Sequence, residues 1–228
     1  MVWEAAVAPA WARSMRLVKQ GAESYVLEGE FLGHRVIFKL RLPKPYMDPA
    51  LDSALRLQRT IKEAKVMTVA RESGVKVPRV LAVYPSLGLV VMELIEGPTL
   101  KDYIGRGEGW RELVIEAGRQ IGGLHRAGVV HGDPTTSNLI VRGSDVYLID
   151  FGLAEFSRSI EDRAVDLHLL REAVTSTHPL LSDEVFRLFM EGYESVVGYE
   201  EAAAVLNRVR SVEMRGRYVA ARRTVWRG

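Results

Sequence analysis

The stretch that decides the fold is HGDPTTSN at residues 131–138, which is followed by LIDFG at residues 148–152. The first segment has the pattern H-x-D-x-x-x-x-N, and the second places D-F-G directly after a strand-like run. Phosphoryl transfer from ATP needs an Asp that orients or accepts the proton of the attacking group, and an Asn and a second Asp that hold magnesium. Asp133, Asn138 and Asp150 stand in that order, and ordinary turn residues would not be expected to produce the combination.

The residues between these segments predict how the three side chains meet. Residues 139–149 form two apolar, strand-like runs around Gly143-Ser144, which is typical of a β-hairpin. The loop before a hairpin and the loop after it end side by side, because the two strands are antiparallel. We therefore expect the two Asp side chains and the Asn to lie at one mouth.

An upstream Lys and Glu complete the set that phosphoryl transfer requires. Lys39 ends the run VIFK at residues 36–39, which matches the V-A-I-K pattern of the lysine that contacts the nucleotide phosphates. Apolar periodicity predicts a helix from about Leu51 to Glu72, and Glu63 lies on it. We predict Lys39 as a catalytic and cofactor-binding residue and Glu63 as its partner, with a solvated helix face as the alternative for Glu63.

Two further segments are predicted to hold the nucleotide. Residues 90–97, VVMELIEG, look like a kinase hinge, in which the carbonyl of Glu93 and the N–H of Ile95 would meet the adenine edge. Gly21 and Ala22 lie where a phosphate-covering loop is expected, although one glycine replaces the usual G-x-G-x-x-G.

A second glycine-rich run is interpreted differently. Gly105, Gly107 and Gly109 come before a helical pattern with no preceding strand, so we read them as a flexible turn. The chain contains no Walker A sequence.

Strand and helix signals predict an α+β, two-lobed, protein-kinase-like fold. The first half is mostly strand with one long helix, and Gly97-Pro98 is a natural hinge after it. The second half is mostly helix and contains the hairpin. We expect a small N-terminal lobe at residues 1–96, a reduced helical C-terminal lobe at 97–214 and a basic tail at 215–228.

Composition excludes several classes of protein. Of 228 residues, 47% are hydrophobic and 26% charged, as in ordinary globular domains. No run approaches the roughly 20 apolar residues of a membrane span, so no membrane partner is expected. Cysteine is absent, which excludes disulfides and thiol chemistry and, together with the lack of a secretory-type leader, predicts a cytoplasmic location.

The positive charge is concentrated at the end of the chain. Residues 208–228 hold seven Arg and one Glu, a net charge of +6, whereas the other residues sum to −4. A helix is expected over about 200–211, and the basic residues beyond it point to an anionic partner such as nucleic acid.

Together these features resemble the small atypical kinase subunit of the KEOPS complex, a relative of the RIO kinases that supports threonylcarbamoyladenosine (t6A) modification of tRNA. The resemblance runs from about Gly21 to Arg217. It is carried by Gly21-Ala22-Glu23, by Lys39 with Arg41, Lys44 and Tyr46, by Arg59-Thr60 with Glu63-Ala64, by HGDPTTSN and IDFG, by Glu161-Asp162 with Ala164-Val165-Asp166-Leu167, by Ser176-Thr177-His178-Pro179 and by Arg215-Gly216-Arg217.

The resemblance implies a serine/threonine kinase or ATPase that uses ATP and Mg²⁺. It implies Asp133 as the catalytic base, Asn138 and Asp150 as metal ligands, and Asp166 as a buried Asp that braces the catalytic loop. The alternative for Asp166 is an ordinary exposed helical Asp. Pro134 departs from the Leu usual in this family and is expected to alter only the loop.

The resemblance also implies partners. The chain would work with other KEOPS subunits, chiefly the one that synthesises t6A. The Arg-rich tail, with Arg215, Arg217, Arg222 and Arg223, would contact tRNA phosphates or reach towards that partner. Met47 replaces a usual Arg and removes one cation near the nucleotide.

Departures from ordinary protein kinases predict an open catalytic mouth. Gly132 replaces the Arg that pairs with a phosphorylated activation loop. Asp166 follows Asp150 by only sixteen positions, and no A-P-E sequence occurs. The phosphate acceptor is therefore left open between water, the protein itself and a restricted Ser/Thr substrate.

Two other functions compete with this one. Small-molecule phosphotransferases of the aminoglycoside or choline kinase type also show H-G-D-x-x-x-x-N, but D-F-G, the basic cluster at residues 39–44 and the short C-terminal lobe argue against them. A nucleotide-binding scaffold with little turnover is disfavoured because all catalytic groups are present.

Overall fold

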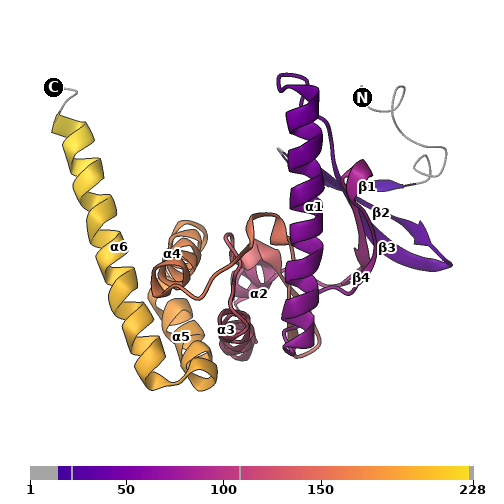
Figure 1. Cartoon of the computed structure of the whole chain (residues 1–228). Coiled ribbons are helices and arrows are strands. Elements are labelled where there is room, and N and C mark those ends of the chain that lie inside the picture. Colours follow the sequence, from indigo (N-terminus) through magenta and orange to yellow (C-terminus); the bar gives the residue numbers. More distant parts are fainter. Residues whose placement is uncertain (1–14, 22, 108, 226–228) are drawn as a thin grey trace. The chain divides into compact units, whose positions relative to one another are not determined.

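The computed structural model describes residues 15–21, 23–107 and 109–225, and the chain divides into two compact units (Figure 1). Unit 1 comprises Met1–Thr68 and Pro78–Ile95, and unit 2 comprises Val69–Val77 and Glu96–Gly228. Unit 1 contains a sheet and most of one long helix, whereas unit 2 is mainly helical, as the α+β interpretation predicts.

Unit 1 is built on a five-stranded antiparallel sheet with strand order β1-β2-β3-β5-β4. Its strands are β1 (Arg16–Gln20), β2 (Ser24–Phe31), β3 (His34–Arg41), β4 (Val80–Tyr84) and β5 (Leu89–Glu93), and its helix is α1 (Pro49–Glu72), whose last turn belongs to unit 2. Alternate strand positions face one side of a sheet, and here they form a core of Leu27, Val36, Phe38, Leu89 and Val91.

The pair Gly33-His34 between two strand-like runs predicts a hairpin turn, but the turn between β2 and β3 falls one residue earlier. Leu32 and Gly33 both have positive φ, at 52° and 78°, which is the conformation of a type I′ hairpin turn. His34 already pairs with Phe31 as the first residue of β3. Gly33 was therefore identified correctly as a turn residue, but His34 was not part of the turn.

Among the described residues, unit 2 contains the end of α1, five further α-helices and two small two-stranded sheets. Its elements after the shared end of α1 are α2 (Leu100–Arg106), α3 (Trp110–Arg126), β6 (Val129–Val130), β7 (Leu139–Arg142), β8 (Asp145–Leu148), β9 (Glu155–Phe156), α4 (Ile160–Thr177), α5 (Ser182–Val197) and α6 (Tyr199–Val225). The strand pairs are β6 with β9 and β7 with β8, and the second pair is the predicted hairpin.

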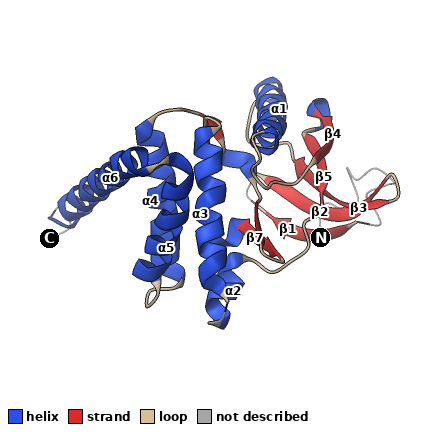
Figure 2. Cartoon of the chain, turned by 90° about the horizontal axis from the view of Figure 1, so that it is seen from below, coloured by secondary structure: helices blue, strands red, loops and turns tan. Residues whose placement is uncertain are grey.

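Glycines allow α3 and α5 to run side by side in close contact (Figure 2). A Cβ on Gly118 of α3 would collide with the backbone carbonyl of Phe189 in α5. A Cβ on Gly192 of α5 would collide in the same way with the carbonyl of Ile115. Because backbone atoms cannot move aside as side chains can, these two positions set the separation of the helices.

The interpretation of residues 105–109 as a flexible turn was only partly correct. Gly105 lies inside α2, while Gly107 has a positive φ and ends that helix. Thr99 caps α2 in a capping box, in which its hydroxyl accepts from the N–H of Asp102 and the Asp102 carboxylate accepts from the N–H of Thr99. The T-x-x-D spacing was the signal for this helix.

The last helix extends further than predicted. A helix was expected over about 200–211, but α6 continues to Val225 (Figure 1). The extension contains no Pro, and the one Gly within it, Gly216, costs only about 1 kcal/mol relative to Ala, which does not end a helix that is otherwise favourable. The side chains of the basic tail lie outside the described part of the chain. Among the described residues, no helix is long and apolar enough to cross a membrane.

We expect Gly118→Ala to lower the free energy of unfolding by about 3 kcal/mol, because the added methyl meets backbone on α5. Gly105→Ala is the matched control. Nothing lies within 4 Å of its Cβ position, so Ala should raise stability by about 0.5–1 kcal/mol through its higher helix propensity. Urea unfolding of both variants measures the difference, and equal stabilities would contradict the close helix contact.

Candidate active site

The predicted catalytic loop of unit 2 lies between β6 and β7 and brings Asp133 to Asn138. The Nδ2 group of Asn138 donates to the Asp133 carboxylate at 2.8 Å and to its backbone carbonyl at 3.0 Å. This orientation leaves the Oδ1 atom of Asn138 as the group that can ligate a cation. The structure therefore joins two of the three predicted side chains directly.

The hairpin brings Asp150 to the same end of β7 and β8. The N–H of Ile149 donates to the carbonyl of Asn138 at 3.0 Å, so Asp150 follows the residue that pairs with Asn138. Asp150 has a φ of 65°, a left-handed conformation that Asp tolerates better than most residues. The sequence placed the three groups at one mouth, and their backbone arrangement agrees with that prediction.

A buried carboxylate holds the start of the catalytic loop. Asp166 on α4 is 1% exposed and accepts from the backbone N–H of His131 at 2.7 Å and of Gly132 at 2.6 Å. Its third partner is Nε2 of His125 at 3.1 Å, and Nδ1 of His125 lies 3.0 Å from the hydroxyl of Tyr193. The alternative of an ordinary exposed helical Asp is therefore wrong, and the bracing geometry is confirmed.

Asp166 carries a negative charge inside this network. Burial by itself would raise the pKa of Asp166, but the hydrogen bond and charge of His125, with contributions from His131, outweigh it and lower the pKa. The carboxylate is thus ionised at neutral pH. Burial also raises the pKa of Tyr193, which keeps its hydroxyl protonated.

Gly132 is required by the backbone that Asp166 holds. Its φ is 81°, and a Cβ there would collide with the carbonyl of Leu153. An Arg at this position would be strained regardless of any role in pairing with an activation loop. The departure from ordinary protein kinases noted in the sequence thus has a local steric cause.

His131 is a structural member of the loop. Its ring is buried, accepts from the N–H of Asp133 through Nδ1 at 3.3 Å, and donates from Nε2 to the carbonyl of Ile149 at 3.1 Å. The ring also packs against Phe151 with centroids 4.8 Å apart. Burial lowers the pKa of His131, so the neutral imidazole joins the catalytic loop to the residue before Asp150.

In unit 1 the predicted Lys39–Glu63 pair is present and has a third member. Nζ of Lys39 donates to Oε1 of Glu63 at 2.6 Å, and Nη2 of Arg41 donates to Oε2 at 2.5 Å. All three side chains are buried, so the alternative of a solvated face for Glu63 is wrong. The sequence identified Arg41 only through the family resemblance, although residues two apart on a strand face the same side.

The predicted phosphate-covering loop is connected to α1 through Glu23. The N–H of Gly21 donates to the carbonyl of Ser24 at 2.9 Å, and Ala22 lies outside the described residues. The carboxylate of Glu23 accepts from Lys44 at 2.9 Å and from Arg59 at 2.6 Å. These two hydrogen bonds lower the pKa of Glu23.

The residues of the predicted hinge lie at the end of β5 and just after it. The N–H of Glu93 donates to the carbonyl of Arg79 at 2.9 Å, and the side chain of Ile95 is buried. Gly97 follows with a φ of 157°, and a Cβ there would collide with the carbonyl of Val141 within unit 2. The contact of Glu93 and Ile95 with an adenine ring stays a prediction.

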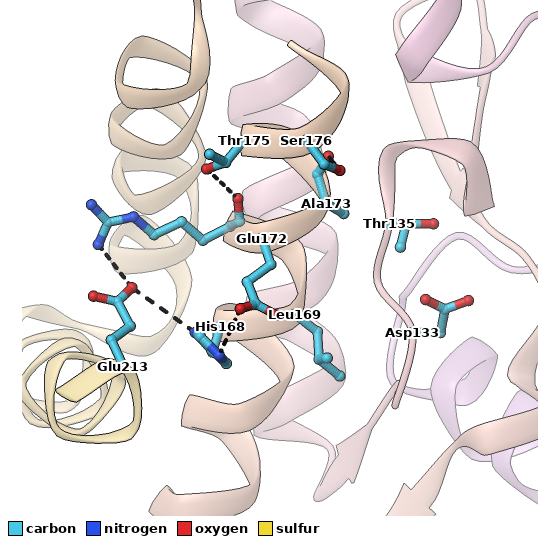
Figure 3. Close-up of a pocket in the computed structure, with 10 residues that line it drawn as sticks. Asp133, Thr135, His168, Leu169, Glu172, Ala173, Thr175, Ser176 and Glu213 are labelled. Carbon is cyan, nitrogen blue, oxygen red and sulfur yellow. Dashed lines mark hydrogen bonds and ion pairs between the residues drawn. The ribbon is translucent and has the colours of Figure 1, made fainter. Parts of the chain in front are cut away.

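Asp133 opens onto a groove of about 970 Å³ in unit 2 that sequence reasoning did not identify (Figure 3). Asp133 and Thr135 form one wall, and Leu169, Ala173 and Ser176 of α4 point towards them. Glu213 from α6 contributes to the lining and accepts from Arg171 at 3.1 Å. No local motif marks this groove, because it brings together the catalytic loop and α4, which are distant in sequence.

The residues at the mouth fit magnesium held together with a nucleotide. Mg²⁺ is commonly bound by one or two protein oxygen ligands plus substrate phosphates. Asn138 and Asp150 offer that kind of ligand. Within the described residues, no group of three or more His, Cys, Asp or Glu forms a self-sufficient metal centre.

Solved structures define the class of fold. The chain is similar to the amicoumacin kinase hAmiN, with a TM-score of 0.59 and 14% identity, over 83% of this chain and 73% of that one. It is also similar to the Rio2 kinase of Chaetomium thermophilum, solved as an ADP/Mg²⁺-phosphoaspartate complex, with a TM-score of 0.58 and 15% identity, over 87% and 70% of the two chains. The fold is that of the protein-kinase-like proteins, as predicted.

Sequence relatives define the family. The RIO domain matches residues 52–159. The KEOPS complex subunit Bud32 of Pyrococcus abyssi is 44% identical over 90% of this chain and 96% of its own length, and the corresponding subunit of Yarrowia lipolytica is 35% identical over 90% and 93%. The chain belongs to the Bud32 family of RIO-type atypical kinases, which confirms the resemblance inferred from the motifs.

Some relatives are longer proteins. A probable bifunctional tRNA threonylcarbamoyladenosine biosynthesis protein of Methanothermobacter thermautotrophicus is 40% identical over 89% of this chain, but the chain spans only 36% of it.

We expect Glu63→Gln to lower the free energy of unfolding by about 3 kcal/mol, because it leaves two buried cations without their carboxylate. Glu28→Gln is the control, since Glu28 also bridges two cations, Arg16 and Arg35, but both are solvent-exposed and the loss should be much smaller. Denaturant unfolding measures both, and similar losses would contradict the buried pairing.

We expect stability to fall as the pH decreases below about 6.5, in part because of His131. The unfolded chain takes up a proton on this imidazole that the folded chain excludes, so protonation favours unfolding between the ordinary pKa and the lowered one. One such proton corresponds to at most about 1.4 kcal/mol per pH unit. His131→Asn should flatten the dependence measured by urea unfolding between about pH 5 and 7.5, and an unchanged slope would contradict the assignment.

Proposed function

We propose that this chain is a Mg-ATP-dependent phosphotransferase or ATPase, an atypical Ser/Thr protein kinase that acts as a subunit of the KEOPS complex in t6A modification of tRNA. The observation that carries the proposal is the pairing of Asn138 with Asp133 in a loop that Asp166 braces. It holds a proton acceptor and a metal-ligating amide together before any substrate binds.

Each predicted residue has a separate role. Asp133 would orient the attacking hydroxyl or water and accept its proton. Asn138 and Asp150 would hold Mg²⁺, which supplies charge neutralisation on the phosphates when bound. Lys39, positioned by Glu63, would contact the α- and β-phosphates.

The remaining nucleotide contacts are proposed from backbone groups. Gly21 and Ala22 would cover the phosphates, and Glu93 and Ile95 would meet the adenine edge. We assign these groups to lobes at residues 1–96 and 97–214, followed by the basic tail at 215–228.

The family supplies the proposed partners. The relatives are described as KEOPS complex subunits or as bifunctional t6A biosynthesis proteins, which supports assembly with the t6A-synthesising subunit. The Arg-rich end of α6 would contact tRNA phosphates or that subunit. We place this activity in the cytoplasm, the compartment predicted from the cysteine-free sequence.

The groove beside Asp133 supports a protein side chain or a water molecule as the acceptor of the phosphoryl group. Hydroxyl and charged side chains line this groove, which suits an acceptor that presents a polar group to Asp133. The likeness to the amicoumacin kinase concerns the fold alone and does not favour a small-molecule acceptor.

We expect Asp133→Asn to reduce turnover of γ-labelled ATP by about 10²–10⁴-fold, because the group that accepts the proton is lost. Asp183→Asn, an exposed change in the first turn of α5, is the matched control and should leave turnover unchanged. The assay follows the label in the presence of Mg²⁺, with the chain alone and with its t6A-synthesising partner.

The fate of the label decides between the remaining possibilities. Labelled Ser or Thr would establish kinase chemistry, and free phosphate would establish ATPase chemistry. Transfer to an aminoglycoside or choline would favour the small-molecule alternative. Equal turnover by the Asp133 and Asp183 variants, or no turnover with and without the partner, would contradict the proposal.

A further inference from the structure

A small cavity in unit 1 has an unusual concentration of charge. Its volume is about 60 Å³, and it lies between the phosphate-covering loop, the chain after β3 and the start of α1. Its charged lining residues are the cations Arg41, Lys44, Arg56 and Arg59 and the carboxylates Glu23 and Asp52.

The inner part of the cavity holds a guanidinium that is incompletely paired. Arg41 is 4% exposed, and its Nη2 donates to Glu63. Its Nη1 is buried and finds no hydrogen-bond partner among the described residues. Arg stays protonated in proteins, and an unsatisfied buried donor is costly, so this atom favours an acceptor brought in from outside.

Asp52 is already committed and does not supply that acceptor. Its carboxylate accepts from Arg56 at 2.7 Å and from the backbone N–H of Lys44 at 3.2 Å. Asp52 and Arg56 thus neutralise each other. The other charged lining residues are Arg41, Lys44, Arg59 and Glu23, and Arg41 also donates to Glu63 outside the lining.

The outer part of the cavity is closed by an exchangeable ion pair. Glu23 bridges Lys44 and Arg59, and its side chain and that of Arg59 are both 42% exposed. Ion pairs with this exposure contribute little to stability and are readily replaced. The carboxylate occupies the position between two cations that an oxyanion would take.

We propose that this cavity is a binding site for a phosphoryl anion, with Arg41, Lys44 and Arg59 as donors and Glu23 as the internal carboxylate that the anion displaces. A phosphate offers several acceptor oxygens, which suits three convergent cations better than a single carboxylate does. The source is either inorganic phosphate or a phosphate of an RNA backbone. The site has its own donors and does not depend on the nucleotide assignment.

Titration calorimetry with inorganic phosphate tests the proposal on the full chain in metal-free, low-salt buffer. Arg59→Gln should weaken binding about tenfold, the loss expected for one charge-assisted hydrogen bond. Glu23→Gln should tighten binding severalfold, because it removes the competing carboxylate. Lys65→Gln, which removes a cation from the exposed face of the same helix outside the cavity, should leave binding unchanged.

The opposite effects expected for Glu23→Gln and Arg59→Gln on phosphate affinity distinguish an anion-binding site from a cluster of purely structural ion pairs. If Glu23, Lys44 and Arg59 only tie the loop to α1, then Glu23→Gln and Arg59→Gln will have the same effect on stability and neither will alter phosphate binding selectively. Loss of phosphate binding when Mg-AMP-PNP is added would also overturn the proposal, since the anion would then occupy the nucleotide's own phosphate position.

A tRNA transcript distinguishes the two sources. If inorganic phosphate does not bind but tRNA affinity falls in Arg59→Gln and rises in Glu23→Gln relative to Lys65→Gln, the phosphate comes from RNA. If neither ligand responds to these variants, the cavity is not an anion site.

Discussion

The arrangement of unit 2 depends on one buried carboxylate. Asp166 is ionised inside the protein, which is costly unless hydrogen bonds offset the lost hydration. Its partners are two consecutive backbone N–H groups and a His side chain. The hydrogen bonds that stabilise the buried charge therefore fix the backbone at residues 131–132 as well as the side chain of His125. Two adjacent N–H groups can point at one carboxylate only if the chain turns sharply between them, and Gly132 supplies that turn through its positive φ. The direction of the chain into Asp133 follows from this constraint.

Unit 1 also depends on one buried carboxylate, Glu63, but this carboxylate binds cationic side chains instead of backbone N–H groups. Glu63 is shared by Lys39 and Arg41, which lie on the same face of β3. Both cations are buried, where Coulomb interactions are screened less than at the surface. One buried donor of this group, Nη1 of Arg41, finds no hydrogen-bond partner among the described residues. That unsatisfied donor supports the phosphoryl anion proposed near Arg41.

The sequence predicted those features that depend on local spacing. The order of Asp133, Asn138 and Asp150 around a hairpin fixed their arrangement, because the geometry of a hairpin is determined by a few consecutive residues. The pairing of Lys39 with Glu63 was also predicted. Its second cation, Arg41, had no assigned role, because the sharing of a carboxylate depends on how α1 lies on β3. The burial of Asp166 could not be decided from helical periodicity, since α4 has polar residues on all its faces.

Tertiary packing explains the remaining differences. The groove beside Asp133 has one wall in the catalytic loop and the other in α4, which are distant in sequence, so no motif marks it. The short connection from Asp150 to Asp166 leaves this groove without an inserted activation loop, and α4 forms its far wall instead. The helix α6 packs against α4 and α5, and its residues Val205 and Val209 are fully buried. Glu213 of α6 accepts from Arg171 at 3.1 Å on the side of α4 that lies away from Asp133 (Figure 3). The side of α4 that faces Asp133 carries Leu169, Ala173 and Ser176, so α6 influences the groove beside Asp133 only through its packing against α4.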